Sequence, residues 1–193
     1  MQSTTGLFVI ISSPTGGGKD ATIEELIKIF PNSARLVTTT SRAPRPADQE
    51  GVTYNFISKE DFESKIKEGY FVEYNNYASN YYGTPKEYLA KMLAEHSIVF
   101  SNIDVNGKHS MDKLGIKNLS IFLLPESIAI LEQRVEKRGG LTKEQIAERI
   151  KIVSQEIEAS KDYGYKLTNY EGKLDETVAN VAKIVQEHLK SNN

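Results

Sequence analysis

A glycine-rich segment that ends in a lysine is the part of this chain whose residue types best suit phosphate chemistry. It reads Ser13-Pro-Thr-Gly-Gly-Gly-Lys19-Asp20 and directly follows the apolar run 7–11. Glycines let backbone amides point at phosphate oxygens, the next helix adds its N-terminal dipole, and a lysine adds a full charge. We therefore predict a phosphate loop made of Ser13, Pro14, Thr15, Gly16, Gly17, Gly18, Lys19, Asp20 and Ala21.

The loop departs from the usual signature G-x-x-x-x-G-K-[ST] at two positions. Ser13 stands in place of the first glycine, which is a mild change. Asp20 stands where a hydroxyl normally faces Mg²⁺, and a carboxylate there suits the helix dipole but repels phosphates unless a metal lies between them. The alternative interpretation is a glycine-rich turn with a surface lysine, but the strand pattern before the loop and the helical pattern after it favour phosphate binding.

The elements that must position this loop alternate between strands and helices. Residues 7–11 are typical of a buried strand, and the segment between Lys19 and Pro31 has the apolar period of a helix. Such alternation indicates βαβ units and an α/β fold with a central, mainly parallel sheet, whose ligands lie at the carboxyl ends of the strands. Further strands are predicted over 36–40, 98–100, 121–124 and 165–168, an irregular sheet with one short helix over 54–84, and helices over 85–95 and 127–138, from Thr142 and from Leu174.

The composition disfavours several classes of function. The 193 residues suit one domain, and 24 basic against 26 acidic residues give a net charge of −2, so we expect no nucleic-acid partner. The absence of cysteine excludes disulfides and thiolate metal sites, and the three histidines lack the spacing of metal ligands. The run 7–11 is too short for a signal or membrane segment, so we expect no membrane partner and a cytoplasmic location.

Further motifs follow the loop in order. They read Thr38-Thr-Thr-Ser-Arg42-Ala-Pro-Arg45-Pro, Gly51-Val-Thr-Tyr54-Asn-Phe, Phe71-Val-Glu73-Tyr, Asn80-Tyr-Tyr82-Gly-Thr84, Ser101-Asn-Ile-Asp104-Val-Asn-Gly107 and Leu131-Glu-Gln-Arg134-Val-Glu-Lys-Arg138-Gly. Together with the loop they resemble the guanylate kinase family over residues 7–189. The resemblance implies a P-loop three-layer fold with a core (1–37, 97–133 and 159–193), an inserted nucleoside-monophosphate-binding subdomain (38–96) and a helical lid (134–158).

The resemblance also implies that the γ-phosphoryl group of ATP is transferred to GMP or dGMP. In the family two arginines and two tyrosines bind the acceptor phosphate, and guanidinium forks match phosphate oxygens in bidentate geometry. A carboxylate and a hydroxyl read guanine, and because the carboxylate repels the acceptor N1 of adenine, this pair selects by mismatch as well as by match. The matching residues are Arg42, Arg45, Tyr54 and Tyr82 for the phosphate, Glu73 and Thr84 for the base, and Thr38 and Asp104 for the rest of the pocket.

Positive charge near the transferred phosphoryl group is what this reaction requires, because its transition state spreads negative charge over the phosphate oxygens. The expected suppliers in this chain are Lys19, Arg42, Arg134, Arg138 and Arg149, and Asn169 matches a family position near the donor adenine. Each of these residues also has a structural interpretation when it is considered alone. The arginines would be solvated surface charges and the two tyrosines would be packing residues. Glu73 would be a surface carboxylate, and Asp104 would cap a helix. The order of the motifs favours the functional interpretation for all of them together.

A second departure concerns the metal. The family places an acid after its third strand, and Asn102 stands there in this chain. The chain thus loses one carboxylate at the strand end and gains one, Asp20, in the loop. We hypothesise that the two changes are coupled and that Asp20, with Asn102 as a neutral contact, anchors Mg²⁺. The alternative is drift in a protein that no longer turns over quickly.

Three functions stay open at this point. The first is an active kinase with Mg²⁺, ATP and GMP or dGMP, acting as a monomer or homodimer. The second is a catalytically weak or inactive binding module on the same fold, and the third is a kinase of another purine monophosphate. The retained Gly18, Lys19 and lid arginines favour the first.

Overall fold

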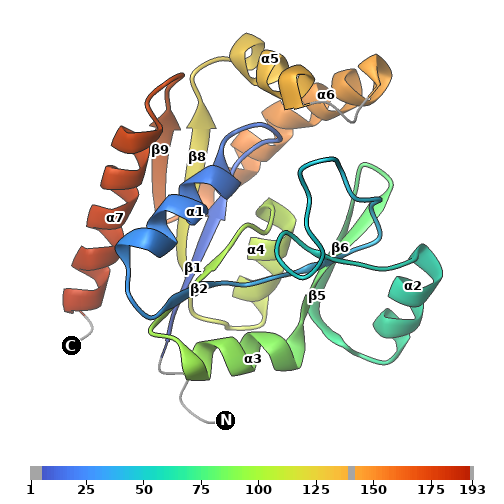
Figure 1. Ribbon diagram of the computed structural model, residues 1–193, viewed down its shortest axis with the longest axis horizontal. Helices are drawn as coiled ribbons and strands as arrows, with labels where there is room; N and C mark the ends of the chain where they lie inside the picture. The colour runs from blue at the N-terminus through green and yellow to red at the C-terminus, as the bar shows by residue number, and fades with distance from the viewer. Residues whose placement is uncertain (1–5, 139–141, 192–193) are drawn as a thin grey trace.

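The computed structural model describes residues 6–138 and 142–191 and contains two sheets that lie side by side (Figure 1). The larger is the core sheet, in which every adjacent pair of strands runs parallel. This arrangement confirms the α/β fold with a central parallel sheet. Its strands, in spatial order, are β2 (Ser33–Arg35), β7 (Ile98–Ser101), β1 (Leu7–Ser12), β8 (Leu119–Pro125) and β9 (Tyr165–Asn169).

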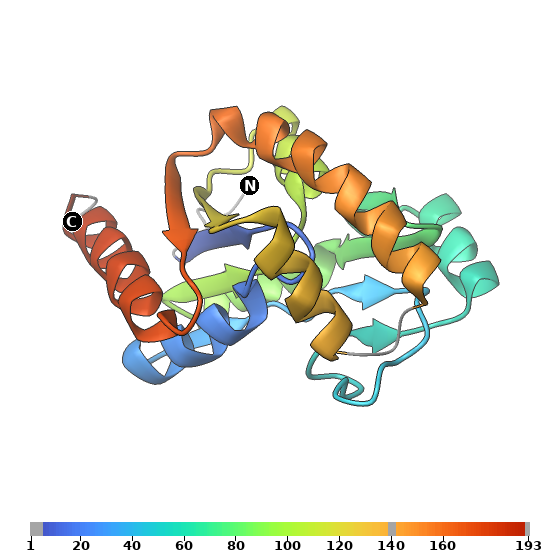
Figure 2. The same ribbon diagram turned by 90° about the horizontal axis from the view of Figure 1, so that it is seen from above.

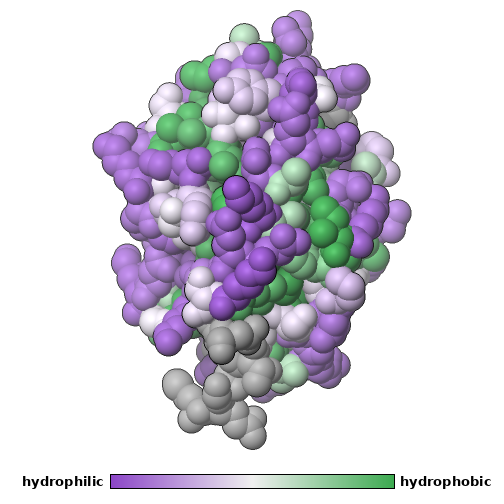
Figure 3. Space-filling view, turned by 90° about the vertical axis from the view of Figure 1, so that its left-hand side faces the viewer, coloured by the Kyte–Doolittle hydropathy of each residue, from purple (hydrophilic) through white to green (hydrophobic). Residues whose placement is uncertain are grey.

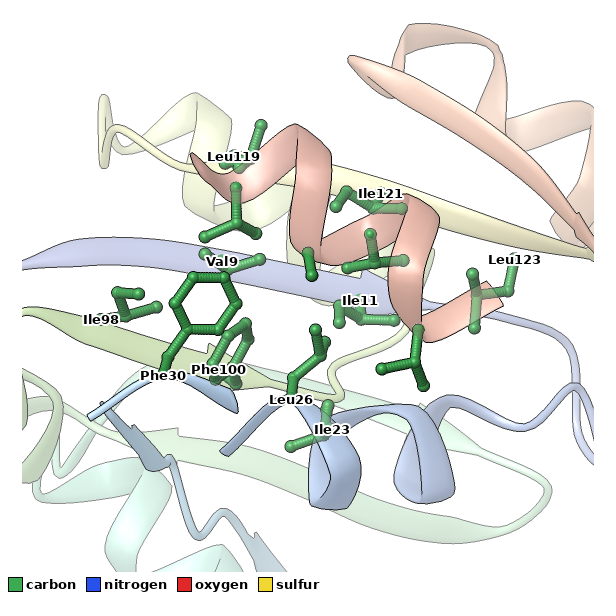
Figure 4. Close-up of a cluster of buried hydrophobic side chains, with 14 residues drawn as sticks. Val9, Ile11, Ile23, Leu26, Phe30, Ile98, Phe100, Leu119, Ile121 and Leu123 are labelled. Atoms are coloured by element: carbon green, nitrogen blue, oxygen red, sulfur yellow. The ribbon is translucent and has the colours of Figure 1, made fainter. Parts of the chain in front are cut away.

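Helices cover both faces of the core sheet, which explains why its central strands read as continuous apolar runs. On one face Val9 and Ile11 of β1 pack with α1 (Lys19–Ile29) and α7 (Leu174–Ser191), in the cluster drawn in Figure 4. On the other face Phe8 and Ile10 pack with α3 (Lys86–Glu95) and α4 (Val105–Lys113). Alternate side chains of one strand thus build two separate apolar layers.

The smaller, mixed sheet stands beside the carboxyl end of the core sheet and carries one helix, α2 (Lys59–Lys67). The single strand predicted over 36–40 is wrong: β2 ends at Arg35 in the core sheet, and β3 begins at Thr39 in the second sheet. The backbone of the intervening residues bonds to both sheets, since the Leu36 amide donates to Phe100 and the Thr38 carbonyl accepts from Asn55. The strands of the second sheet, in order, are β4 (Asn55–Phe56), β3 (Thr39–Thr40), β6 (Asn80–Pro85) and β5 (Phe71–Tyr77).

Two helices, α5 (Ile128–Arg138) and α6 (Lys143–Ala159), lie over the carboxyl end of the core sheet. Figure 2 shows that the N-terminal end of α6 lies toward the second sheet and its C-terminal end over the core. Thr142 caps α6 as predicted, in a capping box with Gln145 that satisfies two otherwise unpaired backbone amides. The short 3₁₀ turn Ser160–Asp162 then leads into β9.

The surface over α1 and α7 is mostly hydrophilic, with smaller apolar areas between the charged side chains (Figure 3). α7 keeps the apolar period predicted for it, and Val178, Val181 and Val185 are buried against the core. Its role here is packing. Among the residues that the structure describes, no helix combines the length and apolar character needed to cross a bilayer.

Candidate active site

The phosphate loop is held in shape by backbone conformations that favour glycine. Gly16 and Gly18 have φ angles of +82° and +90°, in the left-handed region. A Cβ on Gly18 would also lie 2.4 Å from Nδ2 of Asn169, which donates a 3.0 Å hydrogen bond to the Gly17 carbonyl. Thr177 donates in turn to Oδ1 of Asn169, over 2.8 Å. The loop therefore needs glycine at these positions, and Asn169 braces it from β9.

A cleft opens between the loop and the second sheet. It contains most of the residues that the sequence analysis assigned to the acceptor and the metal, although they come from motifs far apart in the chain. The predicted residues that line it are Ser13, Thr15, Lys19, Asp20, Thr38, Arg42, Arg45, Tyr54, Glu73, Tyr82, Asn102 and Asp104.

One part of this cleft is basic and aromatic. Arg42 is buried, and its Nη2 lies 2.8 Å from Oδ2 of Asp48, which also accepts from the Arg45 amide at 2.7 Å. The Arg42 guanidinium lies 5.5 Å from the ring centre of Tyr54, within cation–π range, and the Tyr54 ring meets that of Tyr82 edge-on. Burial raises the pKa of Tyr54, so its hydroxyl keeps its proton. These groups can therefore donate several hydrogen bonds to an anion.

Another part of the cleft carries a buried carboxylate. Glu73 is 6 % exposed and accepts a 2.5 Å hydrogen bond at Oε1 from the Thr84 hydroxyl on the neighbouring strand. Burial raises the pKa of Glu73 to about 7, the hydrogen bond from Thr84 opposes this rise, and the nearby charge of Asp104 adds to it. Glu73 is thus poised to lose its proton when a donor pair reaches it near neutral pH.

Asp104 caps the N-terminus of α4 and also lines the cleft. Its Oδ1 accepts from the Gly107 amide at 2.9 Å, so it caps the helix. Its Oδ2 accepts a 2.8 Å hydrogen bond from Nδ2 of Asn75 on β5, and its side chain lines the cleft. The cap therefore ties the core to the second sheet at the cleft wall.

Asp20 sits at the meeting point of three elements. Its Oδ1 accepts from Nη2 of Arg35 at 2.6 Å and from Nδ2 of Asn102 at 2.8 Å. Burial acts to raise the pKa of Asp20, but the positive charges of Lys19 and Arg35 and the two hydrogen bonds outweigh it and lower the pKa to about 2. The carboxylate is therefore ionised at neutral pH, and the two departures from the family pattern are in direct contact.

Carboxylate and amide oxygens suit Mg²⁺, which usually keeps several waters and completes its coordination with substrate phosphates. Asp20 supplies a carboxylate and Asn102 an amide beside the phosphate loop, and both line the cleft. In this structure Asn102 turns its Nδ2 toward Asp20, so its amide must turn over to offer its oxygen to a metal. Within the described part of the chain, no cluster of three or more histidine, cysteine or acidic side chains forms a metal cage. The residues present therefore fit a metal that arrives with a nucleotide.

A second, open space lies on the other side of the loop and is bordered by Gly16, Gly18, Lys19, Asp20, Ala21 and Arg134. Lys19 and Asp20 line both spaces, so they stand where two ligands would meet. Arg134 forms a 2.6 Å ion pair through Nη2 with Oε2 of the exposed Glu171. The backbone of Arg138 and Arg149 lies in α5 and α6, but their side chains lie outside the described part of the chain.

Some cleft residues were missed in the sequence analysis. Asn75 and Tyr77 share the face of β5 that carries Glu73, because alternate residues of a strand point the same way, and that spacing was the available signal. Tyr77 reaches the phosphate loop, with its hydroxyl 3.1 Å from Oγ1 of Thr15. Glu156 of α6 is buried and also lines the cleft. No short motif marked it in the sequence.

A phosphate loop between a parallel strand and a helix, with a second polar cleft facing it, defines a class of protein. It has one space on each side of a loop lysine, as transfer between two phosphate-bearing ligands requires. The class is that of the P-loop phosphotransferases.

Comparisons with known proteins define the family. The guanylate kinase family model matches residues 6–188, and the chain belongs to that family, which places it among the ATP-dependent nucleoside monophosphate kinases. A guanylate kinase of Rickettsia bellii is 34% identical over 193 residues, covering 100% of both chains. One from Listeria innocua is 36% identical, covering 96% of this chain and 91% of the relative. The crystal structure of guanylate kinase from Anaplasma phagocytophilum, 24% identical, has a TM-score of 0.77 over 96% of this chain and 87% of that one, and supports the fold.

Proposed function

We propose that this protein transfers the γ-phosphoryl group of ATP to GMP or dGMP, yielding ADP and GDP or dGDP. The observation that carries the choice of acceptor is the buried Glu73, which lines the same cleft as Arg42, Tyr54 and Tyr82. Thr84 does not line the cleft; its buried hydroxyl donates to Glu73 from the neighbouring strand. A carboxylate accepts from N1–H and N2–H of guanine, and the Thr84 hydroxyl can turn toward O6 once Glu73 bonds the base. Adenine and the pyrimidines lack this donor pair.

Each part of the cleft has a role in this proposal. Arg42, Arg45, Tyr54 and Tyr82 hold the acceptor phosphate, and Lys19 lies between the two spaces, where it stabilises the charge of the transferred group. Arg134 faces the donor side, and we assign Arg138 and Arg149 to the same task from the family match. The segment 38–96 acts as the acceptor-binding subdomain and 134–158 as the lid, whose closure excludes water.

The experiment that tests the proposal measures ADP release from ATP and Mg²⁺ with GMP, dGMP, AMP, CMP and UMP as separate acceptors. Turnover with GMP or dGMP alone is the expected result. Turnover with another purine monophosphate would assign a different acceptor. GMP binding without turnover would assign a binding module, and the Asp20 and Asn102 departures would be its first suspected cause.

The metal is the second part of the proposal. Mg²⁺ would be held by Asp20 and Asn102 together with nucleotide phosphates, and it would supply charge neutralisation at the phosphates of ATP. Reversion of both residues, Asp20→Ser with Asn102→Asp, should keep one carboxylate at the site and retain activity. Asn102→Asp alone places two carboxylates in contact, and Asp20→Ser alone leaves no carboxylate at the metal site. Each single change should therefore lower kcat about tenfold or more. Each should also alter the Mg²⁺ concentration at which activity is half-maximal. If the effects of the two single changes on kcat are additive, the hypothesis that the changes at positions 20 and 102 are coupled is contradicted.

The raised pKa of Glu73 predicts how GMP affinity depends on pH. Guanine needs the carboxylate, whereas the free protein holds a proton on Glu73 below its pKa of about 7, so binding must release that proton. The Kd for GMP should be nearly constant above pH 8 and rise by roughly tenfold per pH unit below 7, as measured by calorimetry. The GMP phosphate also titrates near pH 6, so Glu73→Gln is the control. In this variant the Kd for GMP should keep only the pH dependence that comes from the phosphate. An equal pH dependence in both proteins would contradict the assignment.

A further inference from the structure

The partner of Asp20 on β2 suggests a role for a residue to which the sequence analysis assigned none. Arg35 is the last residue of β2, and its side chain is 11% exposed. It pairs with Asp20 over 2.6 Å although fifteen positions separate the two residues. Its Nε is buried and has no hydrogen-bond partner in the described part of the chain, so the ion pair with Asp20 is the main compensation for burying this charge.

The charges around the loop show what the pair does. Lys19 and Arg35 contribute two positive charges and Asp20 one negative charge, which leaves a net charge of +1 beside the phosphates. A loop with serine at position 20 and no arginine at position 35 would carry the same net charge. Without Arg35, the charge of Asp20 would cancel that of Lys19, and the attraction of the loop for a polyphosphate would be weaker, with Arg134 as the remaining cation among the described residues that border the second space.

Arg35 acts on the nucleotide through Asp20. It lines neither of the two spaces that border the loop, whereas Asp20 lines both. We propose that Arg35 is a positioning residue for ATP, whose ion pair with Asp20 offsets the repulsion between that carboxylate and the triphosphate and so permits an acid in the phosphate loop. This inference rests on the proposed ATP-dependent function.

Calorimetric titration with ATP, in EDTA and again in MgCl₂, tests the inference. Arg35→Met should raise the Kd for ATP in EDTA by roughly ten- to a hundredfold, since Asp20 then cancels the charge of Lys19 in a partly desolvated site. The loss should be smaller in MgCl₂, because a divalent cation offsets the same charge. In steady-state kinetics the KM for ATP should rise, while the KM for GMP should stay within about twofold. Arg35→Lys, which keeps the charge, should lie between Arg35→Met and the natural protein.

The decisive measurement is a rescue. Adding Asp20→Ser to Arg35→Met restores the net charge of +1, so the double variant should bind ATP in EDTA within about threefold of the natural protein. Lys28→Met is the matched control, because Lys28 is an exposed residue of α1 whose loss changes the net charge equally away from the loop. It should leave the Kd for ATP unchanged.

Each alternative outcome has a distinct meaning. Unchanged ATP affinity in Arg35→Met, or no rescue by Asp20→Ser, would overturn the inference and leave the proposed function standing. If Arg35→Met does not fold, Asp20→Ser alone decides, because its net charge of +2 should tighten ATP binding in EDTA, and an unchanged or weaker affinity would overturn the inference. A natural protein that binds no ATP would contradict the proposed function itself, and the inference with it.

Discussion

Lys19→Met should lower kcat/KM for phosphoryl transfer by about a thousandfold or more, the largest effect we expect from a single substitution. Lys19 borders the cleft and the second space at once. In the proposed function its ammonium would therefore lie where the γ-phosphoryl group passes from one nucleotide to the other. Loss of a preorganised charge at that point removes stabilisation that the transition state needs more than the ground state does. The measurement is steady-state ADP release with GMP as acceptor.

The division of the loss in kcat/KM between kcat and the two KM values is as informative as its size. We expect most of it in kcat, with a smaller rise in the KM for ATP and little change in the KM for GMP. Lys28→Met on the same helix removes an equal charge at an exposed position, and it should change kcat less than twofold. A Lys19→Met protein that retains a tenth of the natural kcat would contradict the placement of this lysine at the transferred group.

Glu73→Gln should raise the Kd for GMP by about a hundredfold or more, the second largest effect. The base offers two donors, N1–H and N2–H, and a neutral amide can accept only one of them while its own NH₂ opposes the other. The Kd for ATP should stay within about twofold, because Glu73 lines the cleft on the acceptor side and not the second space. Calorimetry with each nucleotide separately measures both affinities.

The same variant should be more stable than the natural protein at alkaline pH. The pKa of Glu73 is about 7 in the folded chain, against an ordinary value of 4.5 once the chain unfolds, so between these values the folded state binds more protons than the unfolded state. Stability contributed by this group is therefore present below pH 4.5 and is lost as pH rises through 7. We expect Glu73→Gln to gain roughly 1–3 kcal/mol relative to the natural protein between pH 5 and pH 8, by urea denaturation. A constant difference across that range would contradict the raised pKa.

Two of the arginines that we propose to bind phosphate groups, Arg42 and Arg134, are paired with acidic side chains in the structure. Asp48 is 2 % exposed at its side chain and binds Arg42, so this pair fixes the guanidinium before any ligand arrives. Glu171 is 61% exposed and binds Arg134 near the surface, where an ion pair is weak. A bound phosphate can therefore replace Glu171 as the partner of Arg134 at a small cost in free energy. Arg42, in contrast, stays paired with Asp48 when it binds a phosphate.

Local patterns predicted much of the fold. The phosphate loop, the buried strand before it and the helix after it depend on neighbouring residues, and β1 and α1 appear where the sequence indicated. The Thr142 cap depends on residues three apart and is likewise confirmed. The helix α4 was not predicted, although Asp104 was considered as a cap, because its apolar face is short and polar residues surround it.

The error at 36–40 has a definite physical cause. A run of β-prone residues does not reveal that it changes partners midway, because each half satisfies the same local preference. Only the hydrogen bond of the Leu36 amide to Phe100 in the core sheet and the pairing of Thr39 with Gly83 in the second sheet divide the run between two sheets. The cleft exists because of that change of partner, since it carries Arg42 away from the core and across from the loop.

The sequence by itself determined which residues we propose to carry the chemistry, because ordered motifs depend on residue type and spacing alone. From these came the loop, the acceptor residues and the two departures at Asp20 and Asn102. Only the tertiary structure decided how they meet: that Asp20 contacts Asn102 and is paired with Arg35, and that Asn169 braces the loop. These contacts join residues separated by fifteen to more than a hundred positions, and the packing of strands and helices, not local preference, sets such distances.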